Sequence, residues 1–237
     1  MIKCPNCRHE NMDEANFCMI CQAPLKGKPS PKQEVDLVFC FDTTASMFDE
    51  IDDLKKNAAD FLEALNEKGV KYKVGLIDFR DTKYPPSDRD AIVVTCPLTE
   101  KGVDFHNAVQ GLTHAGGEDP EESAFEALVK ATELEGFRGG TVRKYIVLVT
   151  DAAPRVPDDT GRDAKAITEI LLQKDFRLMM VVPRYDAEKK EPAGCDVYEQ
   201  IKKWMGLKAE IIPLVVDGKR ADFGIIRDRI VIGTLVK

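Results

Sequence analysis

The stretch Val35-Asp36-Leu37-Val38-Phe39-Cys40-Phe41-Asp42-Thr43-Thr44-Ala45-Ser46 joins a mostly apolar run to a group of oxygen-bearing side chains. β-Branched and aromatic runs of this kind are typical of buried parallel strands. A second such run, Tyr145 to Val149, is followed by Thr150-Asp151. An open α/β sheet gathers its ligands at the carboxyl ends of its strands. We therefore expect both groups of oxygens to meet at one edge of a sheet.

The chain after Val35 alternates between strand and helix patterns. Helical spacing of apolar residues predicts a helix over 48–67, and helices are also expected over 121–134, 162–174 and 196–204. Pro120 stands just before the second of these, where a first-turn proline is favoured. Strands are expected at 71–79, at 91–95 near an edge, at 176–182 and at 210–216, and 221–237 is ambiguous, with a helix opening near Ile225. This alternation predicts an α/β fold with a doubly wound, mostly parallel sheet.

A third group of acidic side chains lies in the Gly-rich stretch Gly116-Gly117-Glu118-Asp119-Pro120-Glu121. Carboxylates and hydroxyls brought together suit a hard divalent cation, Mg²⁺ above all, or Mn²⁺ or Ca²⁺. Taken alone, the Asp42-to-Ser46 loop could simply cap the helix that follows it. Three such loops in order along the chain favour a metal site. Asp78 to Asp81 is interpreted as an ion pair and loop feature, and His114 as a surface residue rather than a ligand.

Four of the seven cysteines form two pairs at the N-terminus, Cys4 with Cys7 and Cys18 with Cys21. Two Cys-x-x-Cys pairs supply four thiolates, enough for a tetrahedral Zn²⁺ site. A unit of this size has too few apolar residues to fold by burial alone, so the metal would supply roughly 10–16 kcal/mol of folding free energy. The Pro- and Lys-rich segment 26–34 has nothing to bury and is typical of a linker. The predicted organisation is a zinc ribbon at 1–25, a linker at 26–34 and the α/β domain at 35–237.

Composition narrows the classes of function. A formal charge of −7 argues against a general nucleic-acid binder, which needs a surplus of Lys and Arg. No apolar stretch is long enough to span a membrane, and the N-terminus lacks the apolar core of a signal peptide. An odd cysteine count with Cys-x-x-Cys pairs fits a reducing compartment. We expect a cytosolic protein in which Cys40 packs as a small hydrophobe and neither Cys96 nor Cys195 is reactive.

The order Asp-x-Thr-x-Ser, Gly-rich acidic loop and Thr-Asp resembles the metal-ion-dependent adhesion site of the von Willebrand factor A (vWA) family. The resemblance covers most of residues 35–220. Carried onto this chain, it makes Asp42 a carboxylate that acts through water, Thr44 and Ser46 direct hydroxyl ligands, and Asp151 the contribution of the third loop. It implies a domain that binds partners through the metal, with an open position that an Asp or Glu of the partner can fill.

The second loop departs from the commonest form of the family. The family places a Thr ligand after Gly-Gly, whereas this chain has Glu118 and Asp119. The Gly-Gly-acid-acid-Pro-Glu string resembles a subset of the family that includes domains of hemicentins and of some alpha-kinases. Asp119 is the preferred ligand over Glu118. An extra carboxylate would lower the electrophilicity of the ion, so we expect a tighter and more self-contained site than in the adhesion receptors.

The cysteine-rich segment resembles the N-terminal zinc ribbons of many bacterial and archaeal multidomain proteins. The matches beside the cysteines are Asn11, Ala15, Phe17, Pro24 and Leu25. Those relatives usually carry Gly after each Cys pair, where this chain has Arg8 and Gln22. We interpret the ribbon as a structural or docking element.

The resulting expectation is a non-enzymatic adaptor that binds a protein partner at a divalent-cation site. One alternative is a phosphotransferase resembling the haloacid dehalogenases, with Asp42 as nucleophile. That chemistry needs a second acid two residues later, where this chain has Thr44. The chain also lacks the glycine motifs of phosphate and dinucleotide loops and the Gly-x-Ser-x-Gly elbow. Nucleic-acid binding through the ribbon is a further alternative, although residues 1–34 carry a net charge of only about +1.

Overall fold

The computed structural model describes residues 2–4, 7–12, 33–85, 89–117, 120–216, 219–220 and 223–235. The chain forms two compact units, Met1–Gln33 and Glu34–Lys237, and each is treated by itself. Cys18 and Cys21 of the predicted ribbon, and Glu118 and Asp119 of the predicted metal site, lie outside the described residues.

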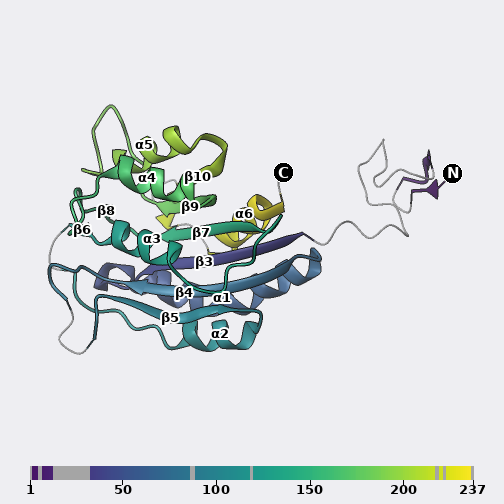
Figure 1. The fold of residues 1–237 in the computed structure, drawn as a ribbon, viewed down its shortest axis with the longest axis horizontal. Helices are drawn as coiled ribbons and strands as arrows, with labels where there is room; N and C mark the ends of the chain where they lie inside the picture. The colour runs from purple at the N-terminus through teal and green to yellow at the C-terminus, as the bar shows by residue number, and fades with distance from the viewer. Residues whose placement is uncertain are drawn as a thin grey trace. The chain divides into compact units, whose positions relative to one another are not determined.

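The larger unit is built on a six-stranded sheet with the order β10-β9-β7-β3-β4-β5 (Figure 1). The strands are β3 (Glu34–Asp42), β4 (Lys71–Phe79), β5 (Ile92–Thr99), β7 (Arg143–Val149), β9 (Phe176–Val182) and β10 (Ala209–Pro213). All neighbouring strands run parallel except β4 and β5, which pair antiparallel at one edge. The prediction of a mostly parallel sheet is confirmed.

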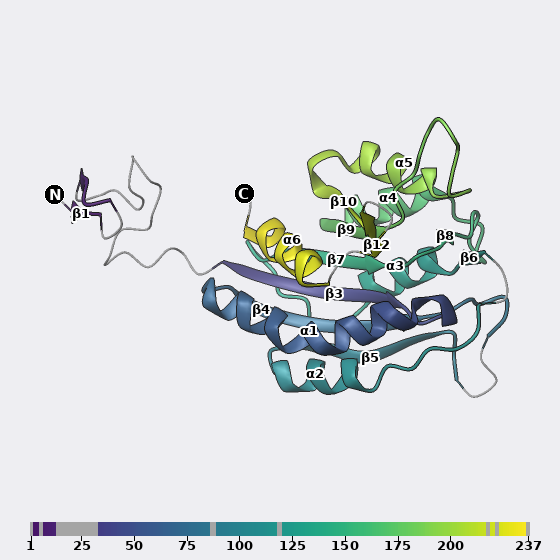
Figure 2. The same cartoon turned by 180° about the vertical axis from the view of Figure 1, so that it is seen from behind.

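Helices cover both faces of this sheet. One face carries α1 (Phe48–Glu67), which follows the 3₁₀ turn η1 (Ala45–Met47), together with α2 (Gly102–Gln110) and α6 (Phe223–Leu235). The other carries α3 (Ala124–Thr132), α4 (Ala164–Gln173) and α5 (Asp196–Met205), the last followed by η2 (Gly206–Lys208). Figure 1 shows α3 and α4 in front of the sheet, and Figure 2, from behind, shows α1 and α6.

The central strand shows why the sheet needs both layers. Val35, Leu37 and Phe39 belong to the core under α1, α2 and α6, whereas Val38 and Cys40 belong to the core under α3, α4 and α5. Successive side chains of a strand point to opposite faces, so a continuous apolar run is buried on both. Cys40 is fully buried, and burial raises the pKa of its thiol far above the usual range. Its predicted packing role is confirmed.

Several predicted elements need correction. The helix expected from Glu121 begins at Ala124 instead, because Glu121–Glu122 forms the short strand β6, which pairs in parallel with β8 (Ala153–Pro154). Helix α2 was not predicted, and strand β5 runs to Thr99 rather than to Thr95. The last predicted strand ends at Pro213, and its remainder is β11 (Val215–Val216), which pairs antiparallel with β12 (Lys219–Arg220). The ambiguous C-terminal stretch forms helix α6.

The described part of the smaller unit is a short hairpin. Strand β1 (Ile2–Lys3) pairs antiparallel with β2 (Glu10–Asn11). The turn between them carries the first cysteine pair. Within the described residues of the whole chain, no helix is both long and apolar enough to cross a membrane.

Candidate metal centre

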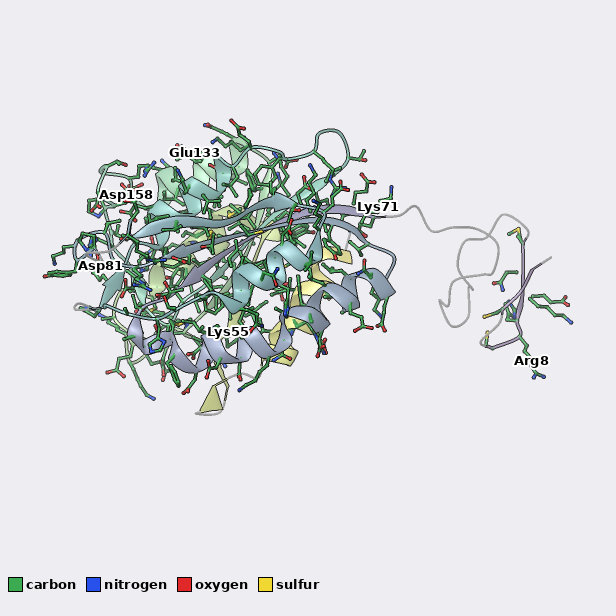
Figure 3. The ribbon with its side chains drawn as sticks, turned by 90° about the horizontal axis from the view of Figure 1, so that it is seen from below. Arg8, Lys55, Lys71, Asp81, Glu133 and Asp158 are labelled. Atoms are coloured by element: carbon green, nitrogen blue, oxygen red, sulfur yellow. The ribbon has the colours of Figure 1, made fainter. Side chains whose placement is uncertain are left out.

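The candidate centre lies where the two central strands end. Strand β3 finishes at Asp42 and pairs in parallel with β7, whose last residue, Val149, is opposite Phe41. Thr150 and Asp151 therefore emerge beside Asp42 and the loop that carries Thr44 and Ser46. Figure 3 shows the labelled Asp81, which follows β4, at this end of the sheet, and Lys71, where β4 begins, at the other.

The carboxylate of Asp42 is buried and anchors the first loop. Its Oδ1 accepts hydrogen bonds from the backbone N–H and the hydroxyl of Thr44, at 2.9 and 2.7 Å. Its Oδ2 accepts a hydrogen bond from the hydroxyl of Thr150, at 2.6 Å. The side chain of Asp42 is 0 % exposed. These contacts suit a residue that orients a ligand hydroxyl and acts on an ion from the second coordination sphere.

The hydroxyl of Ser46 links the first loop to the third. Ser46 Oγ donates to Asp151 Oδ1 at 3.0 Å across 105 positions of the chain. Thr44 Oγ1 and Ser46 Oγ are 3.4 Å apart. Four of the predicted ligands, Asp42, Thr44, Ser46 and Asp151, thus form one connected set of oxygens.

The glycines of the second loop let the backbone pass close to the first loop. Ala45 donates its N–H to the carbonyl of Gly116 at 3.2 Å, and Ala115 donates to the carbonyl of Thr43 at 3.1 Å. Gly117 has a φ of +87°, and a Cβ there would lie 3.2 Å from the Cβ of Thr44. A side chain at position 117 would be strained by both the backbone angle and the contact.

Burial sets the electrostatics of the site. The pKa of Asp42 is raised from 3.8 to about 6, mainly because burial penalises the charged form, while hydrogen bonds from Thr150 and Thr44 oppose the rise and the charge of Asp151 adds to it. A nearby cation would favour the ionised carboxylate and reverse this shift.

The donor set fits a hard divalent ion. Hydroxyl and carboxylate oxygens are the ligands that Mg²⁺ takes in proteins. Across the described residues, no three His, Cys, Asp or Glu side chains lie close enough to hold a metal by themselves. A site here would therefore depend on the hydroxyls of Thr44 and Ser46, with Asp151 as the described carboxylate and Asp42 behind them.

Two residues at this end of the sheet were not assigned a role from the sequence. Thr150 holds Asp42, and its position in the Thr-Asp pair directly after a strand was the available signal. Glu122 is only 3 % exposed and lies beside the second loop, since its Oε1 would be 3.5 Å from a Cβ at Gly117. It is brought there by the pairing of β6 with β8, which has no local sequence pattern.

Asp78 near the end of β4 and Asp81 just after it each form an ion pair, in keeping with the interpretation of Asp78 to Asp81 as an ion-pair and loop feature. Arg89 Nη1 donates to Asp78 Oδ2 at 2.7 Å, and Asp81 forms a salt bridge with Arg155. Arg80 is buried and donates to the hydroxyl of Thr43 and the carbonyl of Thr113, at 3.2 and 2.8 Å. These contacts hold the loops beside the candidate metal centre in place.

His114 was expected at the surface. It is exposed, and its ring packs edge-on against that of Phe48, with 4.8 Å between the ring centres.

The remaining cysteines are consistent with unreactive thiols. Cys96 and Cys195 are buried, and burial is the main cause that raises the pKa of each, in Cys195 to about 11. The thiolate is the nucleophilic form, so a raised pKa lowers reactivity.

At the N-terminus, Cys4 and Cys7 lie close together. The N–H of Cys7 points to Cys4 Sγ at 3.5 Å, the N–H of Cys4 donates to the carbonyl of His9, and that of Arg8 to the carbonyl of Cys4. The backbone N–H directed at the sulfur of Cys4 suits a thiolate ligand. The other predicted zinc ligands, Cys18 and Cys21, lie outside the described residues.

Comparison with known proteins identifies the family of the larger unit. The family model of the von Willebrand factor A domain matches residues 36–207, and the chain belongs to this family. A search of the curated proteins found no match.

Among solved structures, the chain is similar to the pilus adhesin SpaC from Lactobacillus rhamnosus GG. The TM-score is 0.63 at 11 % identity for one crystal form, with 88 % of this chain and 31 % of the adhesin covered. For the open conformation of SpaC the values are 0.59, 13 %, 86 % and 31 %. The chain thus corresponds to about a third of the adhesin, and the likeness is one of fold.

Proposed function

We propose that this vWA domain binds a protein partner at a divalent-cation site formed by Thr44, Ser46 and Asp151, with Asp42 behind them. The observation that carries the proposal is the hydrogen bond of 3.0 Å between Ser46 and Asp151, which connects the oxygens of two separate loops. Glu118 and Asp119 are the candidate contributions of the second loop. The ion would leave an open position for the partner, which an acidic side chain suits.

The nature of the fold supports an interaction role. The domain is similar in fold to part of a protein described as an adhesin. The zinc ribbon would serve as a structural or docking element, with Cys4, Cys7, Cys18 and Cys21 as its ligands. A cytosolic location belongs to the same proposal and rests on the cysteine usage.

We further propose that the chain is not a phosphotransferase. An Asp nucleophile must reach a phosphorus atom, whereas Asp42 is 0 % exposed and both of its carboxylate oxygens accept hydrogen bonds. The wild-type chain is expected to hydrolyse no generic phosphoester in the presence of Mg²⁺. Turnover that disappears in Asp42→Asn would refute this.

The test of the metal site is calorimetric titration of the full chain with Mg²⁺ and Mn²⁺. Ser46→Ala is the informative variant, because Ser46 is exposed and its loss should leave the fold intact. We expect binding to the wild type and at least about tenfold weaker binding to the variant, the loss of one coordinating oxygen. Asp104→Asn, which removes an exposed carboxylate from α2, is the matched control and should bind as the wild type does. Equal binding by all three proteins, or binding by none, would overturn the proposal.

A further inference from the structure

A pocket of about 400 Å³ opens directly beside the candidate metal centre. Ser46 and Asp151 form its boundary with that centre, and Pro192, Ala193 and Cys195, which precede or begin the turn into α5, form another wall. Its remaining lining residues are Gly117, Pro120, Glu122, Ala152 and Ala153. The pocket therefore joins all three loops of the metal centre to the segment before α5.

The charged side chains of this lining are all acidic. Among the described residues that line the pocket, two carry carboxylates, Glu122 and Asp151, and none carries a basic side chain. Its apolar walls consist of prolines and alanines, which present short, rigid surfaces and no side-chain donor. A cation at the carboxylate end would meet acceptors, and an aliphatic chain would meet apolar walls.

Three described carboxylates, those of Asp42, Asp151 and Glu122, lie in this region. The phenol of Tyr198 is buried beside them, and its pKa is raised well above its usual value by burial first, then by Cys195, and then by the carboxylates of Asp42, Asp151 and Glu122. The Tyr198 hydroxyl donates to the carbonyl of Ala152, a lining residue, at 2.8 Å. A bound divalent ion would bring two positive charges to a region that has three carboxylates.

We propose that this pocket receives a basic side chain, Arg or Lys, of the protein partner, with its charged head at Glu122 and Asp151 and its aliphatic stem against Pro120, Pro192 and Ala193. Long basic side chains bury their stems on apolar surface while the charged group finds a polar partner. Charge-assisted hydrogen bonds to carboxylates are stronger than neutral ones. A neutral residue would gain only the apolar part, and an acidic one would be repelled by both carboxylates.

The inference rests on the proposed function only in placing the partner on this face of the domain. It specifies the chemistry of the partner beside the ion, and it can hold or fail independently of metal binding.

The probe is a capped tripeptide, acetyl-Ala-Arg-Ala-amide, with the Gln and Glu analogues as neutral and acidic references. Each is titrated into the isotopically labelled full chain, followed by amide chemical shifts, with Mg²⁺ and again with a chelator. We expect the Arg peptide to shift the amides of Ala193 and Cys195 in both conditions and to bind at least about fivefold more tightly than the Gln peptide.

Two variants and one control locate the binding. Glu122→Gln removes one of the two carboxylates and should weaken binding of the Arg peptide roughly tenfold. Ala193→Tyr places a ring at an exposed wall position and should block the pocket without touching the core. Glu121→Gln is the matched control, because it removes the same charge from the adjacent, exposed residue and should leave binding unchanged.

The outcomes separate this inference from the metal site. Arg binding lost in Ala193→Tyr supports the inference, whether or not the chain binds Mg²⁺. If Glu122→Gln fails to fold, Ala193→Tyr alone decides. An Arg peptide that binds no better than the Gln peptide, or that binds Ala193→Tyr unchanged, overturns the inference. A Glu peptide that binds only with Mg²⁺, beside an inactive Arg peptide, would overturn it while supporting the proposed metal-dependent function.

Discussion

Arg8 adopts a backbone conformation that favours glycine. Its φ is +61°, in the left-handed region, directly after Cys7. That conformation costs a non-glycine residue about 1–2 kcal/mol. The zinc ribbons that this segment resembles usually have Gly at this place, and the backbone angle gives the physical reason. The departure in sequence therefore has an energetic cost in this chain.

Arg8→Gly is expected to bind Zn²⁺ several-fold more tightly than the wild type. Folding and metal binding are coupled in small zinc units, so relief of about 1 kcal/mol of backbone strain appears as affinity. Competition against a chromophoric zinc chelator measures it on the full chain. His9→Gly is the control, since His9 is not among the described residues with positive φ. An unchanged or weaker affinity in Arg8→Gly would refute the prediction.

Asp42 should make the metal-free chain less stable as the pH rises. The pKa of Asp42 is about 6 in the folded chain, against the usual 3.8 of an aspartate in the unfolded chain. Between these two pH values, the folded chain therefore binds more protons than the unfolded chain. Stability from this group is fully present below pH 4 and is lost as the pH rises through 6. At about 1.4 kcal/mol per pKa unit, the loss is about 3 kcal/mol.

The measurement is urea unfolding of the wild type and Asp42→Asn from pH 4 to pH 7 in a chelator. The Asn variant cannot ionise at position 42, so the difference in unfolding free energy between the two proteins isolates this group. We expect the unfolding free energy of the wild type to fall relative to that of Asp42→Asn as the pH rises. Addition of Mg²⁺ at pH 7 should raise the unfolding free energy of the wild type and leave that of Asp42→Asn unchanged. A difference that is constant with pH would contradict the prediction.

At the scale of elements, a buried ion pair between Asp36 and Arg138 holds the start of β3 against the loop before β7. Asp36 is 0 % exposed, and its two carboxylate oxygens accept the side-chain Nε and the backbone N–H of Arg138, at 2.8 and 2.7 Å. Arg138 also donates to the carbonyl of Val35 at 2.7 Å. One arginine thus ties the loop that leads into β7 to the first residues of the central strand.

Arg138→Ala should lower the unfolding free energy by about 3–5 kcal/mol, because it leaves the buried charge of Asp36 uncompensated. Denaturant unfolding at pH 7 measures the change. The double variant Asp36→Leu with Arg138→Met removes both charges and should recover much of the loss. Arg177→Ala, which removes a basic side chain at the start of β9 that lies over the ring of Tyr145, is a milder control. A loss below about 1 kcal/mol in Arg138→Ala would refute this role.

The elements differ in how far the sequence predicts them. Strand β9 was predicted with its observed bounds, and β3 within a residue at each end, because strands buried on both faces have unbroken apolar runs. Helix α2 buries only Phe105 and Val109, so its periodic pattern is weak. Strand β6 consists of two glutamates whose extended conformation depends on pairing with β8, a tertiary contact that no local pattern encodes.

The same distinction holds for the candidate site. Asp42, Thr44, Ser46 and Asp151 were predicted to meet because each follows a strand signal, and parallel strands end at one edge. The support from Thr150 and the placement of Glu122 depend on how neighbouring loops pack. The motif therefore predicts which oxygens lie together, whereas the packing of the loops decides which neighbouring residues form hydrogen bonds to them.

At the scale of the whole molecule, the chain combines two different sources of stability. Both apolar cores of the larger unit consist of residues from Val35 onward, on the two faces of the sheet. The described part of Met1–Gln33 contributes only the buried side chains of Cys4 and Asn11. Burial of apolar surface stabilises the larger unit, whereas a metal would have to stabilise the N-terminal unit.

With zinc bound as proposed for the N-terminal unit, its removal should therefore unfold that unit and spare the larger one. With a zinc-selective chelator, amide signals of residues 2–12 are expected to collapse toward random-coil shifts, while those of β3, β7 and β9 stay in place. Cys7→Ser should show the collapsed signals without any chelator, and Cys96→Ser, which alters a thiol in the larger unit, should respond to the chelator as the wild type does. The contrary outcome is that the signals of β3 and β7 move together with those of residues 2–12. The ribbon would then contribute to the stability of the vWA domain. In that case, zinc binding would affect the candidate metal centre through the stability of the fold.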